Sequence, residues 1–258
     1  MNYLQHYTSI ESVKEILKNQ TIRFNNLGRV NDTNEGETYE FGNVGKYIFV
    51  SCWTDNDKED IPMWKIYGNN MKGIRLSIPY PVFPRHFNER LGGDPMLMKL
   101  DESIFANYFI LPTTDNKFSV KIDYTNEQEK LNPITSLNIG DLDGFKLGTI
   151  GVCKSKSWSF EQEIRFIIYT APTIHKIRLD KGFDVLNFFS SSIDLIKENY
   201  DIGISYIDLK IDSKLMNKII LTTGPLTAAS IIDDLKSFRT KLGLNFEIND
   251  SKLRNKVR

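Results

Sequence analysis

The stretch from Trp158 to Tyr169, WSFEQEIRFIIY, restricts the possible fold more than any other part of the sequence. Read with the two-residue period of a β-strand, it separates an apolar face from a polar one. The apolar face holds Trp158, Phe160, Ile164, Phe166 and Ile168, and the polar face holds Ser159, Glu161, Glu163 and Arg165. Carboxylates are depleted in strands, so two glutamates here indicate a possible functional site. The alternative is a half-exposed strand with Glu163 and Arg165 paired at the surface.

Strand and helix patterns elsewhere in the chain mix without regular alternation. The apolar run 47–53 predicts a strand buried on both faces. A capping-box pattern from Thr8 to Glu11 predicts a helix that ends at Asn19-Gln20, and Pro62 predicts the start of a second helix. Further predicted strands cover 3–7, 21–24, 73–78, 118–124, 174–179 and 204–211, and further predicted helices cover 102–109, 142–152 and 185–198.

These patterns predict one α+β domain over residues 1–258, built around a mixed, mostly antiparallel sheet. The weakly patterned, proline-containing segment from about 80 to 116 is interpreted as an insertion in that core. The segment 218–250 predicts a strand, a helix and a strand joined by one crossover.

Composition bears on the partners and the compartment. Lys and Arg number 33 and so do Asp and Glu, so no overall charge attracts the chain to nucleic acid or to an anionic membrane. The basic tail, Lys252 to Arg258, is expected to be a frayed, solvated terminus rather than a binding arm.

Cys52 and Cys153 lie far apart, which fits a reducing cytoplasm. No signal-peptide pattern and no run of about 18 apolar residues appears, so no membrane association is expected.

Several catalytic motifs are missing from the sequence. It has no G-x-G-x-x-G after a strand, no P-loop and no G-x-S-x-G elbow. Its three histidines do not form an H-E-x-x-H motif, so no metal site is expected from histidine. A carboxylate-only magnesium site, and with it a nuclease or phosphohydrolase activity, stays open. Its ligands would be Asp32, Glu35, Glu161 and Glu163.

Five sequence blocks in one order resemble a bacterial family known chiefly as a domain of unknown function. Members of that family are often found near phage-defence and abortive-infection genes. The blocks are His6-Tyr7-Thr8-Ser9, Asn31-Asp32 with Glu35-Gly36, Ser51-Cys52-Trp53, Pro62-Met63-Trp64 with Tyr67-Gly68, and Trp158 with Glu161, Glu163 and Arg165. The segment from Ile219 to Leu253 is also similar to that family's strand, helix and closing Ser-Lys tail.

The first block also resembles the start of ADP-ribosyltransferase-like folds, and this resemblance implies NAD as the substrate. His6 would hold the NAD ribose, Tyr67 or Trp53 would stack on nicotinamide, and Glu163 would drive the reaction. The middle strand lacks the superfamily's Ser-Thr-Ser motif, to which Ser51 alone corresponds. The other residues expected to contact NAD are Tyr7, Thr8, Trp64 and Arg165.

The chemistry of NAD gives these residues distinct expected roles. Nicotinamide leaves as a neutral group, so one carboxylate, Glu163, can suffice by offsetting positive charge at the anomeric carbon. Glu161 would orient or deprotonate an acceptor, which would be water, a protein or a nucleic acid. Arg165 would bind the diphosphate or would only pair with Glu163.

Each residue also has a purely structural interpretation. His6 could be a hydrogen-bonded structural histidine, Asn31-Asp32 a turn, and Cys52 an inert apolar residue. Trp64 and Tyr67 could belong to the core. The main alternative to an enzyme is a non-catalytic module that senses a nucleotide or binds a protein.

Geometry separates these hypotheses. In an enzyme, His6, Glu163 and an aromatic side chain converge on one cleft, whereas a module leaves Glu163 on open surface. A nuclease gathers its four carboxylates around a cation.

Overall fold

The computed structural model describes residues 2–84, 107–111, 119–139, 142–145, 147–173 and 185–257 of the chain. The main sheet contains β1 (Tyr3–Thr8), β2 (Thr21–Asn26), β5 (Ile48–Thr54), β6 (Ile74–Pro79), β7 (Tyr108–Ile110), β8 (Ser119–Lys121), β13 (Glu163–Pro172), β14 (Tyr206–Lys210), β15 (Ile220–Thr223) and β16 (Glu247–Asp250). Three small two-stranded sheets pair β3 (Glu37–Thr38) with β4 (Gly42–Asn43), β9 (Asp123–Thr125) with β12 (Cys153–Ser155), and β10 (Ser136–Ile139) with β11 (Leu142–Phe145). The α-helices are α1 (Ile10–Asn19), α2 (Ile61–Ile66), α3 (Gln128–Leu131), α4 (Val185–Lys197) and α5 (Ala229–Lys241).

The main sheet is mostly antiparallel. Its principal strand order is β14-β2-β5-β1-β6-β15-β16, and β13 adds to the free side of β5 and also pairs with β7 and β8. Within this sheet β15 and β16 are parallel, and α5 connects them as the crossover predicted from the sequence. The α+β class and the mostly antiparallel sheet are therefore confirmed.

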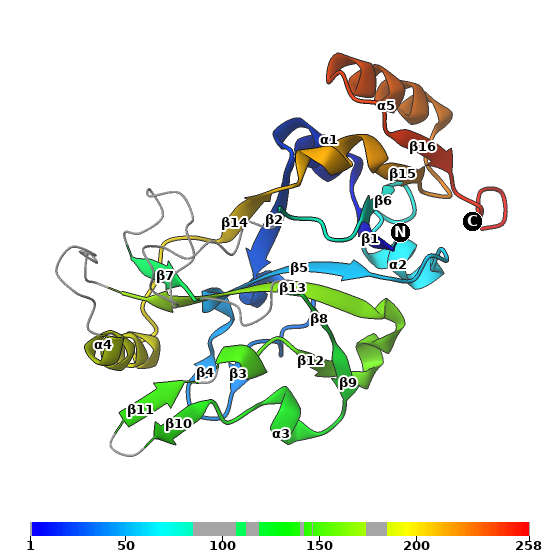
Figure 1. Ribbon diagram of the computed structural model, residues 1–258. Helices are drawn as coiled ribbons and strands as arrows, with labels where there is room; N and C mark the ends of the chain where they lie inside the picture. The colour runs from blue at the N-terminus through cyan, green and yellow to red at the C-terminus, as the bar shows by residue number, and fades with distance from the viewer. Residues whose placement is uncertain are drawn as a thin grey trace.

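A fork in this sheet positions the candidate site. On one side, β5 pairs with β13 from Glu163–Thr54 to Tyr169–Ile48. On the other side, β5 pairs with β2 at Phe49 and Val50 and with β1 at Thr54. The segment 51–53 lies between these two pairings, so β1 and β2 diverge there. Both extend to the same side of β5, with α1 connecting them (Figure 1).

The apolar core surrounds the central strands. Phe24 of β2, Phe49 of β5 and Leu76 of β6 are completely buried, as the continuous apolar run in β5 predicts. The short α2 helix begins after Asp60, whose carboxylate accepts a hydrogen bond from the Met63 N–H at 2.9 Å. Among the described residues, no helix is long and apolar enough to cross a membrane.

The C-terminal tail is docked rather than frayed, contrary to expectation. Leu253 and Val257 pack against a small second core of Tyr7, Trp64 and Met71. The carboxylate of Glu59 accepts hydrogen bonds from the Lys252 N–H at 2.7 Å and from the hydroxyl of Ser251. Apolar burial and this capped turn explain why the sequence's basic character did not keep the tail in solvent.

Two predictions for the stretch from Trp158 to Tyr169 were wrong, one about where the strand begins and one about the exposure of Glu163 and Arg165. The strand does not begin at Trp158, because Lys156–Glu161 forms a 3₁₀ helix, η6, capped by Ser155. Gln162 then takes a left-handed conformation with φ of 45°, and β13 starts at Glu163. The two-residue period therefore holds only from Glu163 onward. Glu163 and Arg165 are also buried, so the predicted surface pair does not exist.

Other differences are smaller. Within the predicted helix 142–152, Leu142–Phe145 is the strand β11, which pairs antiparallel with β10, and Leu147–Thr149 is a 3₁₀ helix. The described end of the predicted helix 102–109 belongs to strand β7. Ser9, not Thr8, caps α1, accepting the Ser12 N–H at 3.1 Å. The predicted strand 174–179 and most of the 80–116 insertion lie outside the described residues.

Candidate functional site

A cavity of about 680 Å³ occupies the fork between β1 and β2. Its size is typical of a small-molecule site. Cys52 and Trp53, which are neighbours on β5, both line it. Nine of the ten predicted site residues line it: His6, Tyr7, Thr8, Ser51, Trp53, Tyr67, Glu161, Glu163 and Arg165.

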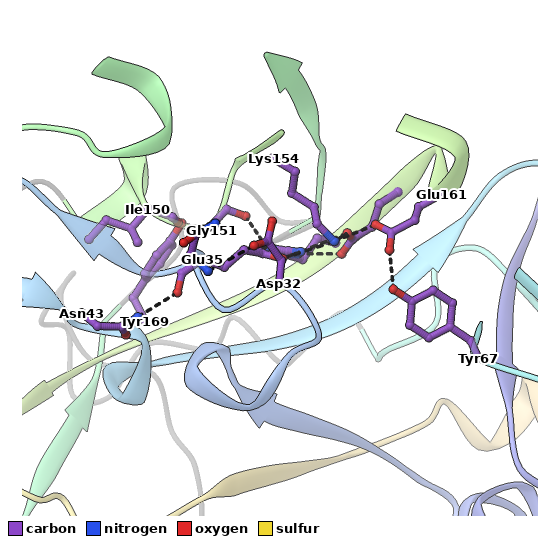
Figure 2. Close-up of polar contacts among 12 residues, drawn as sticks. Asp32, Glu35, Asn43, Tyr67, Ile150, Gly151, Lys154, Glu161 and Tyr169 are labelled. Atoms are coloured by element: carbon purple, nitrogen blue, oxygen red, sulfur yellow. Dashed lines mark hydrogen bonds and ion pairs between the residues drawn. The ribbon is translucent and has the colours of Figure 1, made fainter. Parts of the chain in front are cut away.

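Four buried charged side chains that line the cavity, together with Glu35, which does not line it, form a group that we call the ion cluster. Its members are Glu35, Lys154, Glu161, Glu163 and Arg165. Figure 2 labels Glu35, Lys154 and Glu161. Each is at most 6% exposed, and Arg165 is completely buried. Buried charges are costly unless they are paired and hydrogen-bonded, and here every one is.

Arg165 is bound on two sides by carboxylates. Its Nε and Nη2 donate to Glu163 at 2.6 and 2.9 Å, and its Nη1 and Nη2 donate to the two oxygens of Glu35. Nη1 also donates to the Gly151 carbonyl at 2.9 Å. These contacts use all five guanidinium N–H groups, so Arg165 has none left for a diphosphate. The predicted role in NAD binding is therefore wrong, and pairing with Glu163 is what the structure shows.

Lys154, on the short strand β12, links the carboxylates to one another. Its ammonium lies 2.6 Å from Glu161 and 3.2 Å from both Glu163 and Glu35. The ammonium also lies 5.0 Å from the ring centre of Trp158. Three carboxylates therefore face two cations, which leaves one negative charge unbalanced when all are ionised.

A tight turn delivers Glu35 to the ion cluster. The Asp32 carboxylate accepts the Asn34 N–H at 3.1 Å, and the Asp32 carbonyl accepts the Glu35 N–H at 3.2 Å. Gly36 follows with φ of +87°, and a Cβ there would lie 2.8 Å from Gly45 Cα. The Asn31-Asp32 block is thus a turn, as its structural interpretation proposed, and its function is to place Glu35.

The two glutamates predicted as catalytic have opposite pKa shifts. Burial opposes ionisation of Glu163, but Arg165 and Lys154 outweigh it and lower its pKa to about 2. Burial raises the pKa of Glu161, although Lys154 partly offsets this effect. The hydroxyl of Tyr67 donates to Glu161 Oε1 (Figure 2), and both residues line the cavity. Glu161 is therefore the member of the pair better suited to exchange a proton.

His6 is held in a defined tautomer. Its Nδ1 lies 2.8 Å from the carbonyl of Cys52, which can only accept, so Nδ1 carries the proton. Burial lowers the pKa of His6, so the ring is neutral at neutral pH and Nε2 keeps a lone pair. This tautomer allows Nε2 to accept a hydrogen bond from a hydroxyl group of a ligand in the cavity.

The predicted aromatic residues differ in their access to the cavity. Trp64 is completely buried, donates through Nε1 to Glu59 at 3.0 Å and does not line the cavity, so its predicted stacking role is wrong. Trp53 lines the cavity, but its side chain is only 2% exposed. The centre of its ring lies 5.0 Å from that of His6, and its Nε1 donates a hydrogen bond to Ser51 Oγ. Tyr67 is partly exposed, which makes it the aromatic best placed to meet a ligand.

Tyr7 and Thr8 line the cavity from β1. The Tyr7 ring is buried against Trp64 edge to face, and its hydroxyl accepts the Asp60 N–H at 3.2 Å. Tyr7 therefore supports the wall of the cavity and has little free surface. Thr8 is only partly buried, so its side chain stays available as a contact.

Sequence reasoning missed Lys154 and assigned Glu35 only to a metal site. Glu35 does meet Glu161 and Glu163, but around Lys154 and Arg165 rather than around a metal. In the described part of the chain, no three His, Cys, Asp or Glu side chains are placed to hold a metal ion. A signal for Lys154 existed, because three buried carboxylates need more than one cation.

The fold and site together define an α+β protein with a buried ion cluster at the fork of its sheet. No protein-family model, no curated protein and no solved structure matches this chain.

Proposed function

We propose that this chain is a cytoplasmic, NAD-consuming enzyme of the ADP-ribosyltransferase-like type, acting in bacterial phage defence or a similar conflict. It would transfer ADP-ribose to a macromolecule or hydrolyse NAD. The observation that carries this proposal is the convergence of His6, Tyr67, Glu161 and Glu163 on one cavity. The resemblance of the His6-Tyr7-Thr8-Ser9 block and the Glu-x-Glu pair to that superfamily supports the choice of NAD.

The charge of the ion cluster suits this reaction. The bond between nicotinamide and the ribose C1′ breaks, its electron pair stays on the ring nitrogen, and neutral nicotinamide leaves. Positive charge then moves to the sugar as an oxocarbenium-like centre. The ion cluster has one more carboxylate than cations, so it favours positive charge beside it.

Individual residues then have separate tasks. Glu163, fixed by Arg165, supplies a rigid negative charge near C1′. Neutral His6 accepts a hydrogen bond from a ribose hydroxyl through Nε2, and the ring of Tyr67 lies beside nicotinamide. Glu161 accepts the proton released when water or another acceptor attacks C1′, because its pKa is raised toward the working range.

The test is release of free nicotinamide from NAD by the purified chain, with and without bacterial lysate as a source of acceptors. Glu163→Gln and Glu161→Gln are compared with Glu198→Gln, an exposed glutamate outside the cavity. We expect turnover to fall by roughly 10²–10³-fold in the cavity variants and to be unchanged in the control. Circular dichroism checks that each variant folds.

Two results would contradict the proposal. One is that the wild-type chain releases no nicotinamide under any condition and shows no NAD-dependent thermal shift. The other is that folded Glu161→Gln and Glu163→Gln proteins release nicotinamide at the wild-type rate.

Glu163 is buried, which is not what a non-catalytic module was expected to show, but its bonding favours a nucleotide-sensing module as a second candidate. Both oxygens of this carboxylate are occupied by Arg165 and Lys154, which makes it a rigid part of the wall. In that case NAD or a related nucleotide binds without turnover, and Glu163→Gln changes affinity only. A thermal shift without nicotinamide release would support this candidate.

A further inference from the structure

The cavity continues away from the ion cluster as a second region, the distal arm. One wall is β2, from which Thr21, Ile22, Arg23 and Asn25 line the cavity. The four steps from Thr21 to Asn25 along the strand correspond to about 13 Å. The opposite wall is one face of α1, with Glu11, Ser12, Glu15, Ile16 and Asn19. Strand β14 contributes one further lining residue, Asp208.

Negative charge dominates the distal arm. Arg23 is bound to Asp208 by two hydrogen bonds of 2.9 Å and lies 3.7 Å from the ring centre of Tyr206, so its charge is compensated and its position fixed. Glu11 and Glu15 are exposed and one helical turn apart on α1. Glu15 also accepts a hydrogen bond from Asn19 Nδ2 at 3.0 Å. The arm therefore holds three carboxylates, those of Asp208, Glu11 and Glu15, and one cation, Arg23.

One cation of the cavity lining, Arg29, differs from the others in its pairing. Arg29 lies in the 3₁₀ helix η1 (Leu27–Arg29), which directly follows β2, and its side chain is exposed while lining the cavity. The other lining cations, Arg23, Lys154 and Arg165, are all bound to carboxylates. Within the described ranges, no carboxylate is found paired with Arg29. Its guanidinium can therefore bind an anionic group of a ligand.

We propose that the cavity binds an extended dinucleotide with its diphosphate at Arg29 and its second nucleoside in the distal arm, and that the arm requires an unphosphorylated ribose. Three parts of the cavity lining carry this inference: the ion cluster, which favours a cationic group, Arg29, which can bind an anion, and the exposed carboxylates of α1. The proposal rests on the proposed function and identifies the substrate as NAD rather than NADP.

The selectivity follows from like-charge repulsion. A phosphate monoester on the second ribose would bring about 1.5 to 2 negative charges toward Glu11 and Glu15. Ribose hydroxyls, in contrast, can donate to the same carboxylates and to the side-chain oxygen of Asn19. Juxtaposed like charges exclude wrong ligands more strongly than they weaken the correct one.

Calorimetric binding of separate probes to the full chain tests the proposal. The probes are NAD, NADP, ADP-ribose and nicotinamide mononucleotide, which carries only the reacting half. The variants are Arg29→Gln and Glu15→Lys, with Lys18→Gln as the control, since Lys18 is exposed on α1 outside the cavity. All three positions are exposed, so the variants are expected to fold.

The expected results are specific to each probe. Wild-type protein binds NAD at least about tenfold more tightly than NADP. Arg29→Gln weakens ADP-ribose roughly ten- to hundredfold, Glu15→Lys narrows or reverses the preference for NAD, and Lys18→Gln changes neither.

Equal affinities for NAD and NADP, or ADP-ribose binding that does not depend on Arg29, would overturn the inference while leaving NAD as a substrate. If NAD, NADP and nicotinamide mononucleotide all fail to bind, both this inference and the proposed function are wrong.

Discussion

The two ends of the cavity differ in how their carboxylates are stabilised. At the ion cluster, the side chains of Glu35, Glu161 and Glu163 are 3–4% exposed and are held by Lys154 and Arg165. In the distal arm, Glu11 and Glu15 are exposed. Buried carboxylates persist only with fixed partners, whereas exposed ones are hydrated and need none. The ion cluster is therefore expected to contribute to the stability of the fold. The carboxylates of the distal arm are expected to affect ligand preference without a large effect on stability.

The largest effect is expected from removing Arg165. Arg165→Met leaves Glu35 and Glu163 buried beside a single shared cation, Lys154, and we expect a loss of about 3–5 kcal/mol in the free energy of unfolding, measured by urea denaturation. Arg23→Met, which breaks the exposed pair with Asp208, is the matched control and should cost at most about 1 kcal/mol. Similar losses for the two variants would contradict the contrast between the two ends.

A somewhat smaller effect is expected from pH at the ion cluster. The folded-state pKa of Glu163 is lowered from 4.5 to about 2, so the ionised carboxylate stabilises the fold above pH 4.5, and this stabilisation disappears as the pH falls toward 2. The stability difference between wild type and Glu163→Gln should therefore shrink by about 3 kcal/mol between pH 5 and pH 2. Denaturation at a series of pH values measures it, and a constant difference would show that Glu163 is not held ionised.

A moderate effect is expected at the edge of the ion cluster. Tyr67→Phe removes the hydroxyl that donates to Glu161, which should cost about 1–2 kcal/mol of stability. Because that hydrogen bond lowers the pKa of Glu161, the variant should raise it further. Titration of the Glu161 carboxyl carbon by NMR measures this shift, and a pKa that falls or stays constant would mean that the hydroxyl does not bond to the carboxylate in solution.

The smallest effect is expected in the distal arm. Glu15→Gln removes repulsion from Glu11 one turn away, and should change the free energy of unfolding by less than about 0.5 kcal/mol. Urea denaturation again provides the measurement. A loss of more than about 1 kcal/mol would mean that the arm, like the ion cluster, is part of what holds the fold together.

Much of the fold was predictable because its signals are local. The apolar run of β5, the helical spacing of α1 and the proline that opens α2 each depend on a few neighbouring residues. The predicted strand start at Trp158 was wrong for a physical reason. A 3₁₀ helix capped by Ser155 and the left-handed backbone of Gln162 interrupt the apolar–polar alternation that the sequence shows. Of the site, the sequence indicated His6, Tyr67, Glu161 and Glu163, which do meet at the cavity.

The sequence by itself determined the α+β class, most of the elements and the presence of a Glu-x-Glu-x-Arg strand entry. Only the tertiary structure decided that Arg165 is buried against Glu35, 130 residues away, and that Lys154 neutralises the glutamates. Periodicity reports which face of an element is apolar, but the partner of a buried charge depends on strand register and on how β1 and β2 diverge. Strand register and the divergence of β1 and β2 depend on the packing of the whole sheet, so a local sequence pattern does not predict them.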